Sequence, residues 1–207
     1  MWWYQTKKFK INFEITSHCQ AKCPACPRIF FKNRWNLGNH MKFEDFKSVV
    51  DLNEKIAKES CCYFAGELGD PILHPEFHRI LTYASSKFDI VEVSTNGGAR
   101  TSDWFHNIMM KLKNVYFHFC IDGTKENISS IYRVNVDFDK AFNNLLSASK
   151  ADRNRAWWIY TKFDFNKHDR QNARKISKDK NLKLIFRFNV SDFSVDEHDK
   201  MQSLRLL

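Results

Sequence analysis

The sequence contains no long apolar run. None of its hydrophobic stretches reaches the roughly 20 residues needed to cross a bilayer, and the N-terminal MWWYQTKKFK has no apolar core typical of a signal peptide. No low-complexity segment and no obvious linker divides the 207 residues, of which 43% are hydrophobic. We therefore expect a cytoplasmic protein with no membrane partner, built as a single domain over residues 1–207 with a short polar tail from about residue 189.

The six cysteines do not indicate a disulfide framework. Disulfides are rare in a reducing compartment, so these residues are expected to be metal ligands or buried apolar side chains. No cysteine follows Cys120. The net charge of +9 would suit an anionic partner. However, many of the positive charges fall between residues 170 and 183, on the outer face of an expected helix, and no nucleic-acid motif accompanies them. A nucleic-acid partner is therefore not expected.

Apolar runs alternate with amphipathic stretches along most of the chain. The expected strands are Phe9–Ile15, Cys61–Ala65, Ile90–Ser94, Val115–Ile121, Trp157–Phe163 and Leu184–Phe188. The expected helices are Phe43–Lys58, Pro75–Lys87, Ser102–Lys113, Phe138–Lys150 and His168–Lys178. Such alternation predicts an α/β fold with a parallel sheet and outer helices. Because eight units need about 250 residues, we expect a partial (β/α)6 barrel of the TIM type.

Residues of chemical interest follow the first four expected strands. Cys19, Cys23 and Cys26 form a CxxxCxxC array after the first, and AGELGDPILHP (65–75) follows the second. STNGG (94–98) ends the third and CIDG (120–123) ends the fourth. Ligands of parallel β/α barrels bind at the carboxyl ends of the strands. These segments are therefore expected to meet in one site.

Three thiolates can hold three corners of a cubane iron–sulfur cluster and leave the fourth iron open for a substrate or cofactor. The same three cysteines could instead bind zinc if a histidine completed the set, and His18 and His40 are near in sequence. A structural zinc site would not explain the three later strand-end motifs. The array and the motifs together favour the iron–sulfur interpretation.

In these motifs the chain resembles the radical S-adenosylmethionine (SAM) enzymes, in particular their MoaA/SPASM-type branch. Gly69-Asp70-Pro71 resembles the Gly-Glu-Pro segment that receives the methionyl ammonium, with Asp for Glu. Ser94 and Asn96 match the strand end that holds the ribose hydroxyls. Residues 120–145 resemble the SIDG…R segment, which assigns Asp122 to the cofactor site and pairs Arg133 with the SAM carboxylate. Ala25 occupies the position that contacts adenine.

The resemblance implies one [4Fe–4S] cluster on the three cysteines and SAM as cofactors. It also implies oxygen sensitivity, a flavodoxin- or ferredoxin-like electron donor, and a substrate that is a peptide, a nucleotide or a sugar. SPASM members usually carry auxiliary clusters on a cysteine-rich C-terminal region, which this sequence lacks. Two alternatives stay open: a zinc-stabilised module that binds an anionic polymer, and a degenerate barrel that binds SAM without turnover. Ala25, Asp70 and Cys120 depart from the residues usual in the family, which keeps the degenerate barrel open.

The other cysteines and one histidine have simpler interpretations. Cys61, Cys62 and Cys120 lie within or at the end of expected strands and are interpreted as core residues. His118 alternates with Tyr116 and Cys120 along a strand, so it could face the barrel interior as a proton donor or be a satisfied polar residue.

Overall fold

Six parallel strands form one sheet in the order β1-β2-β3-β4-β5-β6. The computed structural model describes residues 9–28 and 38–188, and the polar tail expected from about residue 189 lies outside them. The strands are β1 Phe9–Asn12, β2 Ser60–Phe64, β3 Ile90–Thr95, β4 Val115–Cys120, β5 Ala156–Lys162 and β6 Lys183–Phe188. The helices are α2 Phe43–Leu52, α3 Glu54–Glu59, α4 Phe77–Lys87, α5 Ser102–Lys111, α6 Glu126–Tyr132, α7 Phe138–Asp152 and α8 Arg170–Asp179. This arrangement confirms the predicted α/β fold with six parallel strands.

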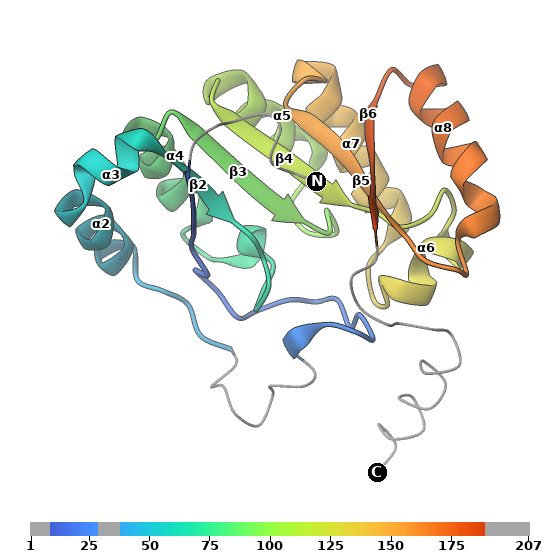
Figure 1. Ribbon diagram of the computed structural model, residues 1–207, viewed down its shortest axis with the longest axis horizontal. Coiled ribbons are helices and arrows are strands. Elements are labelled where there is room, and N and C mark those ends of the chain that lie inside the picture. Colours follow the sequence, from blue (N-terminus) through green and yellow to red (C-terminus); the bar gives the residue numbers. More distant parts are fainter. Residues whose placement is uncertain (1–8, 29–37, 189–207) are drawn as a thin grey trace, which may run out of the picture.

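The helices cover one face of the curved sheet, and the other face carries none of the labelled helices (Figure 1). Strand side chains alternate between these faces. Val91, Val93 and Phe117 join the main core with helix residues such as Phe105 and Leu145. The opposite face carries the polar residues Glu92, Ser94 and His118 beside a second, smaller apolar cluster of Cys120, Trp157 and Ile159. One face of the sheet therefore packs against the helices, and the labelled helices leave the other face uncovered.

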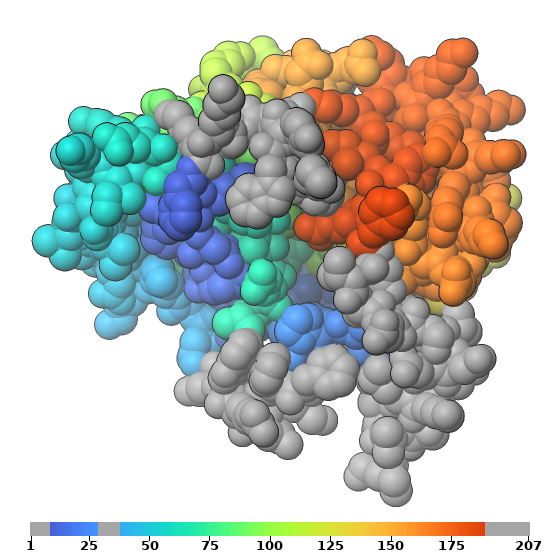
Figure 2. All heavy atoms as spheres, in the orientation of Figure 1, coloured from blue at the N-terminus to red at the C-terminus, as the bar shows by residue number. Residues whose placement is uncertain are grey.

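The sheet does not close on itself. Within the described part of the chain, β1 and β6 are the two edge strands and do not pair with each other. In the space-filling view, the blue atoms of β1 and the red atoms of β6 are visible on the same face of the molecule (Figure 2). The fold is thus the open six-unit barrel that the strand count predicted.

Two expected elements are shorter than predicted because polar groups redirect the backbone. The helix expected over Phe43–Lys58 is divided at Asn53, whose side chain donates to the carbonyl of Val49 at 2.8 Å and so ends α2. The first strand ends at Asn12 rather than Ile15. Beyond it, residues 15–17 bond instead to residues 39–41, with the Ile15 carbonyl accepting from the Met41 amide at 2.8 Å. This second pairing directs the chain into the cysteine loop.

No helix in residues 9–28 and 38–188 has both the length and the apolar character to cross a membrane.

Candidate functional site

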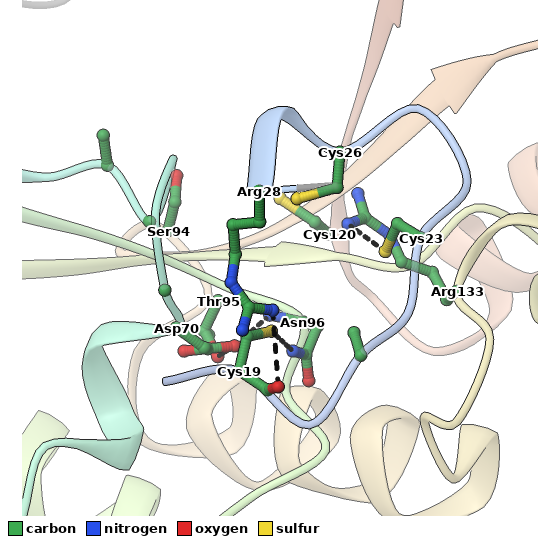
Figure 3. A pocket seen from close by; sticks show the side chains of 14 residues that line it. Cys19, Cys23, Cys26, Arg28, Asp70, Ser94, Thr95, Asn96, Cys120 and Arg133 are labelled. Atoms are coloured by element: carbon green, nitrogen blue, oxygen red, sulfur yellow. Dashed lines mark hydrogen bonds between the residues drawn. The ribbon is translucent and has the colours of Figure 1, made fainter. Parts of the chain in front are cut away.

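A cavity lies at the carboxyl ends of the strands (Figure 3), with about 460 Å³ of empty space when the open solvent at its mouth is included. It collects segments that are far apart in sequence: the cysteine loop, the loop after β2, the end of β3, the end of β4 and the residue after α6. Its lining consists of Cys19, Ala21, Cys23, Cys26, Arg28, Ala65, Gly66, Gly69, Asp70, Ser94, Thr95, Asn96, Cys120 and Arg133. The structure therefore brings residues of the four strand-end motifs together at one cavity, as expected.

The cysteine loop presents three free thiols to this cavity. Burial raises the pKa of the Cys19 thiol to about 12, and the Asp70 carboxylate adds to the effect. Burial also raises the pKa of Cys23, although the Arg133 guanidinium opposes this rise. Metals bind thiolates and not thiols. A cation in this cavity would therefore supply the positive charge that the buried thiolates need.

Side-chain N–H groups of an asparagine and an arginine lie close to two of these sulfur atoms. Asn96 Nδ2 donates to Cys19 Sγ at 3.6 Å, and Arg133 Nη1 donates to Cys23 Sγ at 3.7 Å. Such N–H···S contacts favour the thiolate form and influence the electronic properties of a metal bound to it. Two of the three thiols thus carry the kind of hydrogen bonds found around metal-bound sulfur.

Asp70 joins the loop after β2 to the end of β3. One carboxylate oxygen accepts from Thr95 Oγ1 and from the Asn96 amide, both at 2.9 Å, while the other accepts from the Ile72 amide at 3.3 Å. Burial raises the pKa of Asp70 to about 6, although these hydrogen bonds hold it down. The carboxyl group is thus fixed at the cavity wall.

Gly69 allows this loop to lie against the cysteine loop. A Cβ added at Gly69 would lie 2.3 Å from the Thr16 carbonyl oxygen and 2.7 Å from that of His18. The Asp70 amide also donates to the His18 carbonyl at 2.8 Å. Only glycine permits this approach of two backbones, which explains the Gly-Asp pair at this position.

The β3 end places Ser94 and Asn96 in different environments. Ser94 Oγ lies 2.9 Å from the Tyr63 hydroxyl, on the helix-free face of the sheet. Asn96 Oδ1 accepts from Gln20 Nε2 at 2.7 Å and from the Gly98 amide at 2.8 Å. Asn96 therefore connects β3 to the cysteine loop in addition to lining the cavity.

Arg133 reaches the cavity from the end of α6 and is held by Asp122. Its Nε donates to Asp122 Oδ2 at 2.7 Å, and the other carboxylate oxygen accepts from the Thr161 amide at 2.7 Å. The Asp122 side chain is completely buried, while that of Arg133 is 18% exposed. Asp122 fixes the position of the guanidinium and is not itself among the lining residues.

Not every residue singled out from the sequence lines the cavity. Ala25 lies on the cysteine loop but outside the lining, as does Asp122. Cys61, Cys62 and Cys120 are buried, as expected for core residues, yet Cys120 also lines the cavity. Arg28 lines it too and was not singled out from the sequence, although a basic residue two positions after the third cysteine was a usable signal.

The arrangement suits a cluster better than a single metal ion. Among the described residues, no group of three or more His, Cys, Asp or Glu side chains is placed to hold one metal ion. His18 and His40 stack on each other with ring centroids 4.3 Å apart, and neither lines the cavity. A cubane spreads its three thiolates over three irons, so its ligands need not converge on one point. The donor set of three free thiols, with Cys23 buried and Cys19 and Cys26 partly buried, fits such a cluster.

Comparisons of sequence identify curated relatives over part of the chain. It is 28% identical over 123 residues to a tungsten-containing aldehyde ferredoxin oxidoreductase cofactor-modifying protein of Pyrococcus furiosus, covering 58% of this chain and 33% of the relative. It is 23% identical over 122 residues to the antilisterial bacteriocin subtilosin biosynthesis protein AlbA of Bacillus subtilis, covering 59% and 26%. The aligned stretch thus spans about a third or less of either relative. No family model matches the chain.

Solved structures share the fold over nearly the whole chain. SuiB of Streptococcus suis bound to the precursor peptide SuiA aligns with a TM-score of 0.71 at 9% identity, covering 96% of this chain and 46% of that one. The enzyme anSMEcpe with bound AdoMet aligns with a TM-score of 0.66 at 18% identity, covering 91% and 55%. Both are radical SAM enzymes. The chain therefore has the fold of the radical SAM enzymes and resembles them in sequence, as its motifs predicted.

Proposed function

We propose that this chain is a radical SAM enzyme with one [4Fe–4S] cluster. The observation that carries the proposal is the set of three free thiols, Cys19, Cys23 and Cys26, on the wall of a cavity at the carboxyl ends of the strands. The fold around that cavity is shared with a radical SAM enzyme that has AdoMet bound. When bound, such a cluster would supply one electron for the cleavage of SAM to methionine and a 5′-deoxyadenosyl radical, which would abstract hydrogen from the substrate.

The three cysteines would hold the cluster, and other residues would position SAM. In this proposal Gly69 and Asp70 face the methionyl ammonium, with the Asp70 carboxylate fixed by Thr95 and the Asn96 amide. Ser94 and Asn96 face the ribose, and the loop around Ala25 approaches the adenine. Arg133 provides positive charge for the carboxylate while Asp122 fixes its orientation.

Several residues of the cavity wall are buried, which limits the access of water to them. Asp70 is 4% exposed, Asn96 6% and Cys23 7%. A shielded cavity strengthens electrostatic contacts and limits quenching of reactive species by solvent. The chain's own contribution is thus to bind, orient and shield.

For the substrate we propose a peptide. Two of the structurally similar enzymes were solved with peptides, SuiB with its precursor SuiA and anSMEcpe with Cp18Cys. The open edge between β1 and β6 offers a route by which an extended chain could enter. A nucleotide or sugar substrate is the alternative, and a flavodoxin- or ferredoxin-like protein is proposed as electron donor.

Anaerobic reconstitution followed by mass spectrometry tests this function. The full chain, loaded with iron and sulfide and reduced by dithionite, should convert SAM to 5′-deoxyadenosine and methionine. A Cys23→Ala protein prepared in parallel should not. Binding of SAM without 5′-deoxyadenosine would indicate the degenerate barrel, and retained cleavage in the Cys23→Ala protein would exclude the assigned ligands.

A further inference from the structure

Arg28 is a cation in the cavity with no assigned role. It lines the same wall as Cys19 and follows the third cysteine by two positions. Its Nη1 donates to the Cys19 carbonyl at 3.4 Å, which directs the guanidinium toward Cys19 and Asn96 (Figure 3). Its Nε is buried and meets no hydrogen-bond acceptor among the residues that the structure describes. An unsatisfied buried donor on a cavity wall indicates a ligand group.

The charges around the cavity show what kind of group is missing. Arg133 is paired with Asp122 at 2.7 Å, whereas no salt bridge joins Arg28 to any residue in the described part of the chain. A guanidinium removed from water needs an anion, and its planar donors match a carboxylate best. Within residues 9–28 and 38–188, Arg28 therefore has no anionic partner, and a bound anion would supply one.

The negative charge of Asp70 near Arg28 further limits the kind of ligand that would fit the cavity. The Asp70 carboxylate and the Arg28 guanidinium both lie beside Cys19 at the cavity wall (Figure 3). They line the same cavity with opposite charges. A pair of this kind is complementary to a zwitterion with one ammonium and one carboxylate group, as in an α-amino acid.

From this geometry we propose that Arg28 binds the carboxylate of the methionyl part of SAM, opposite the ammonium that Asp70 receives. The proposal rests on the proposed function and deepens it. It adds a second arginine to Arg133, whose Nε and Nη1 already donate to Asp122 and to Cys23. Arg28 is thus a residue that distinguishes SAM from a ligand lacking the carboxylate.

The test compares SAM with decarboxylated SAM. Both are titrated by anaerobic calorimetry against reconstituted full chain without reductant, so that no cleavage occurs. Arg28→Ala should weaken SAM binding by about 10- to 100-fold, as expected when a charge-assisted hydrogen bond is lost. Binding of decarboxylated SAM should change by less than about twofold, because it cannot use the contact. Arg28→Lys should fall between wild type and Arg28→Ala.

Lys22→Ala is the matched control. Lys22 is an exposed cation on the same loop, outside the cavity lining, so its removal should leave both affinities unchanged. Thermal unfolding and iron content are measured on every variant. Equal weakening of both ligands, no change for either, or loss of iron in Arg28→Ala would each overturn the proposal. A wild-type protein that takes up no iron or does not bind SAM would instead overturn the proposed function.

Discussion

Replacing Asp122 by asparagine should destabilise the protein far more than replacing a surface carboxylate. Asp122 is completely buried and accepts from Arg133 Nε and from the Thr161 amide, each at 2.7 Å. An asparagine amide has one oxygen and one NH2 group. Whichever way it is turned, the NH2 group faces one of these two donors, and the charge that balances Arg133 is gone.

The magnitude follows from the loss of one partner in a buried ion pair. Breaking such a pair typically costs about 3 to 5 kcal/mol, because the remaining charge stays buried without compensation. For a chain of this size, about 1 kcal/mol lowers the midpoint of thermal unfolding by about 2 to 4 °C. Asp122→Asn should therefore lower that midpoint by about 6 to 20 °C.

Thermal unfolding followed by circular dichroism measures this effect. Glu54→Gln is the control, since Glu54 is half-exposed and pairs with Lys58 at 3.4 Å on the helix surface, and such pairs contribute less than about 1 kcal/mol. Arg133→Met should cost less in the Asp122→Asn background than in the wild type, because the unpaired cation is then removed. If Asp122→Asn unfolds within a degree or two of Glu54→Gln, the buried ion pair does not hold Arg133 as argued.

Three further predictions concern the thiols, the loop contact and pH. Cys23→Ala should abolish iron uptake measured by elemental analysis, whereas Cys61→Ala, which removes a buried thiol outside the cavity lining, should retain it. Gly69→Ala should both lower the unfolding midpoint and reduce iron uptake, because its Cβ would lie 2.3 Å from the Thr16 carbonyl oxygen and must displace the cysteine loop; normal uptake would contradict the contact. Burial, together with nearby cations, lowers the pKa of His118 to about 3. In the unfolded chain His118 takes up a proton near pH 6.5. The free energy of unfolding should therefore be unaffected by His118 above that pH and fall by about 1.4 kcal/mol per pH unit as the pH drops toward 3. Chemical denaturation at a series of pH values measures this dependence. In His118→Phe, which keeps a ring to stack on Trp157, the free energy of unfolding should depend less steeply on pH. The same pH dependence in this variant as in the wild type would contradict a lowered pKa of His118.

Most of the fold could be predicted because strand burial leaves a periodic signal. β3 and β4 alternate apolar and polar residues, such as Val93 beside Ser94, and their bounds differ from the predicted ones by a single residue. The break at Asn53 could not be predicted from periodicity, since it depends on a side-chain bond to the Val49 carbonyl. Helix α6 was missed because its seven residues bury only Ser129 and form no apolar stripe.

Site residues that belong to a motif could be predicted from the sequence, whereas those whose position depends on a tertiary contact could not. The cysteines, Asp70 and Arg133 meet in one cavity because parallel strand ends share an edge. Asp122 accepts a hydrogen bond from Arg133 at 2.7 Å and does not line the cavity. This contact depends on how the chain folds and has no signal in the local sequence. Cys120 belongs to the lining because the end of β4 and the cysteine loop border the same cavity, which no local sequence pattern records.

Metal and sulfide analysis of the anaerobically reconstituted full chain tests the central claim most directly. One [4Fe–4S] cluster per chain should give about four irons and four sulfides, with an electron paramagnetic resonance signal of the reduced protein that changes when SAM is added. A single zinc per chain, held by four side chains of the protein and unaffected by SAM, would contradict it.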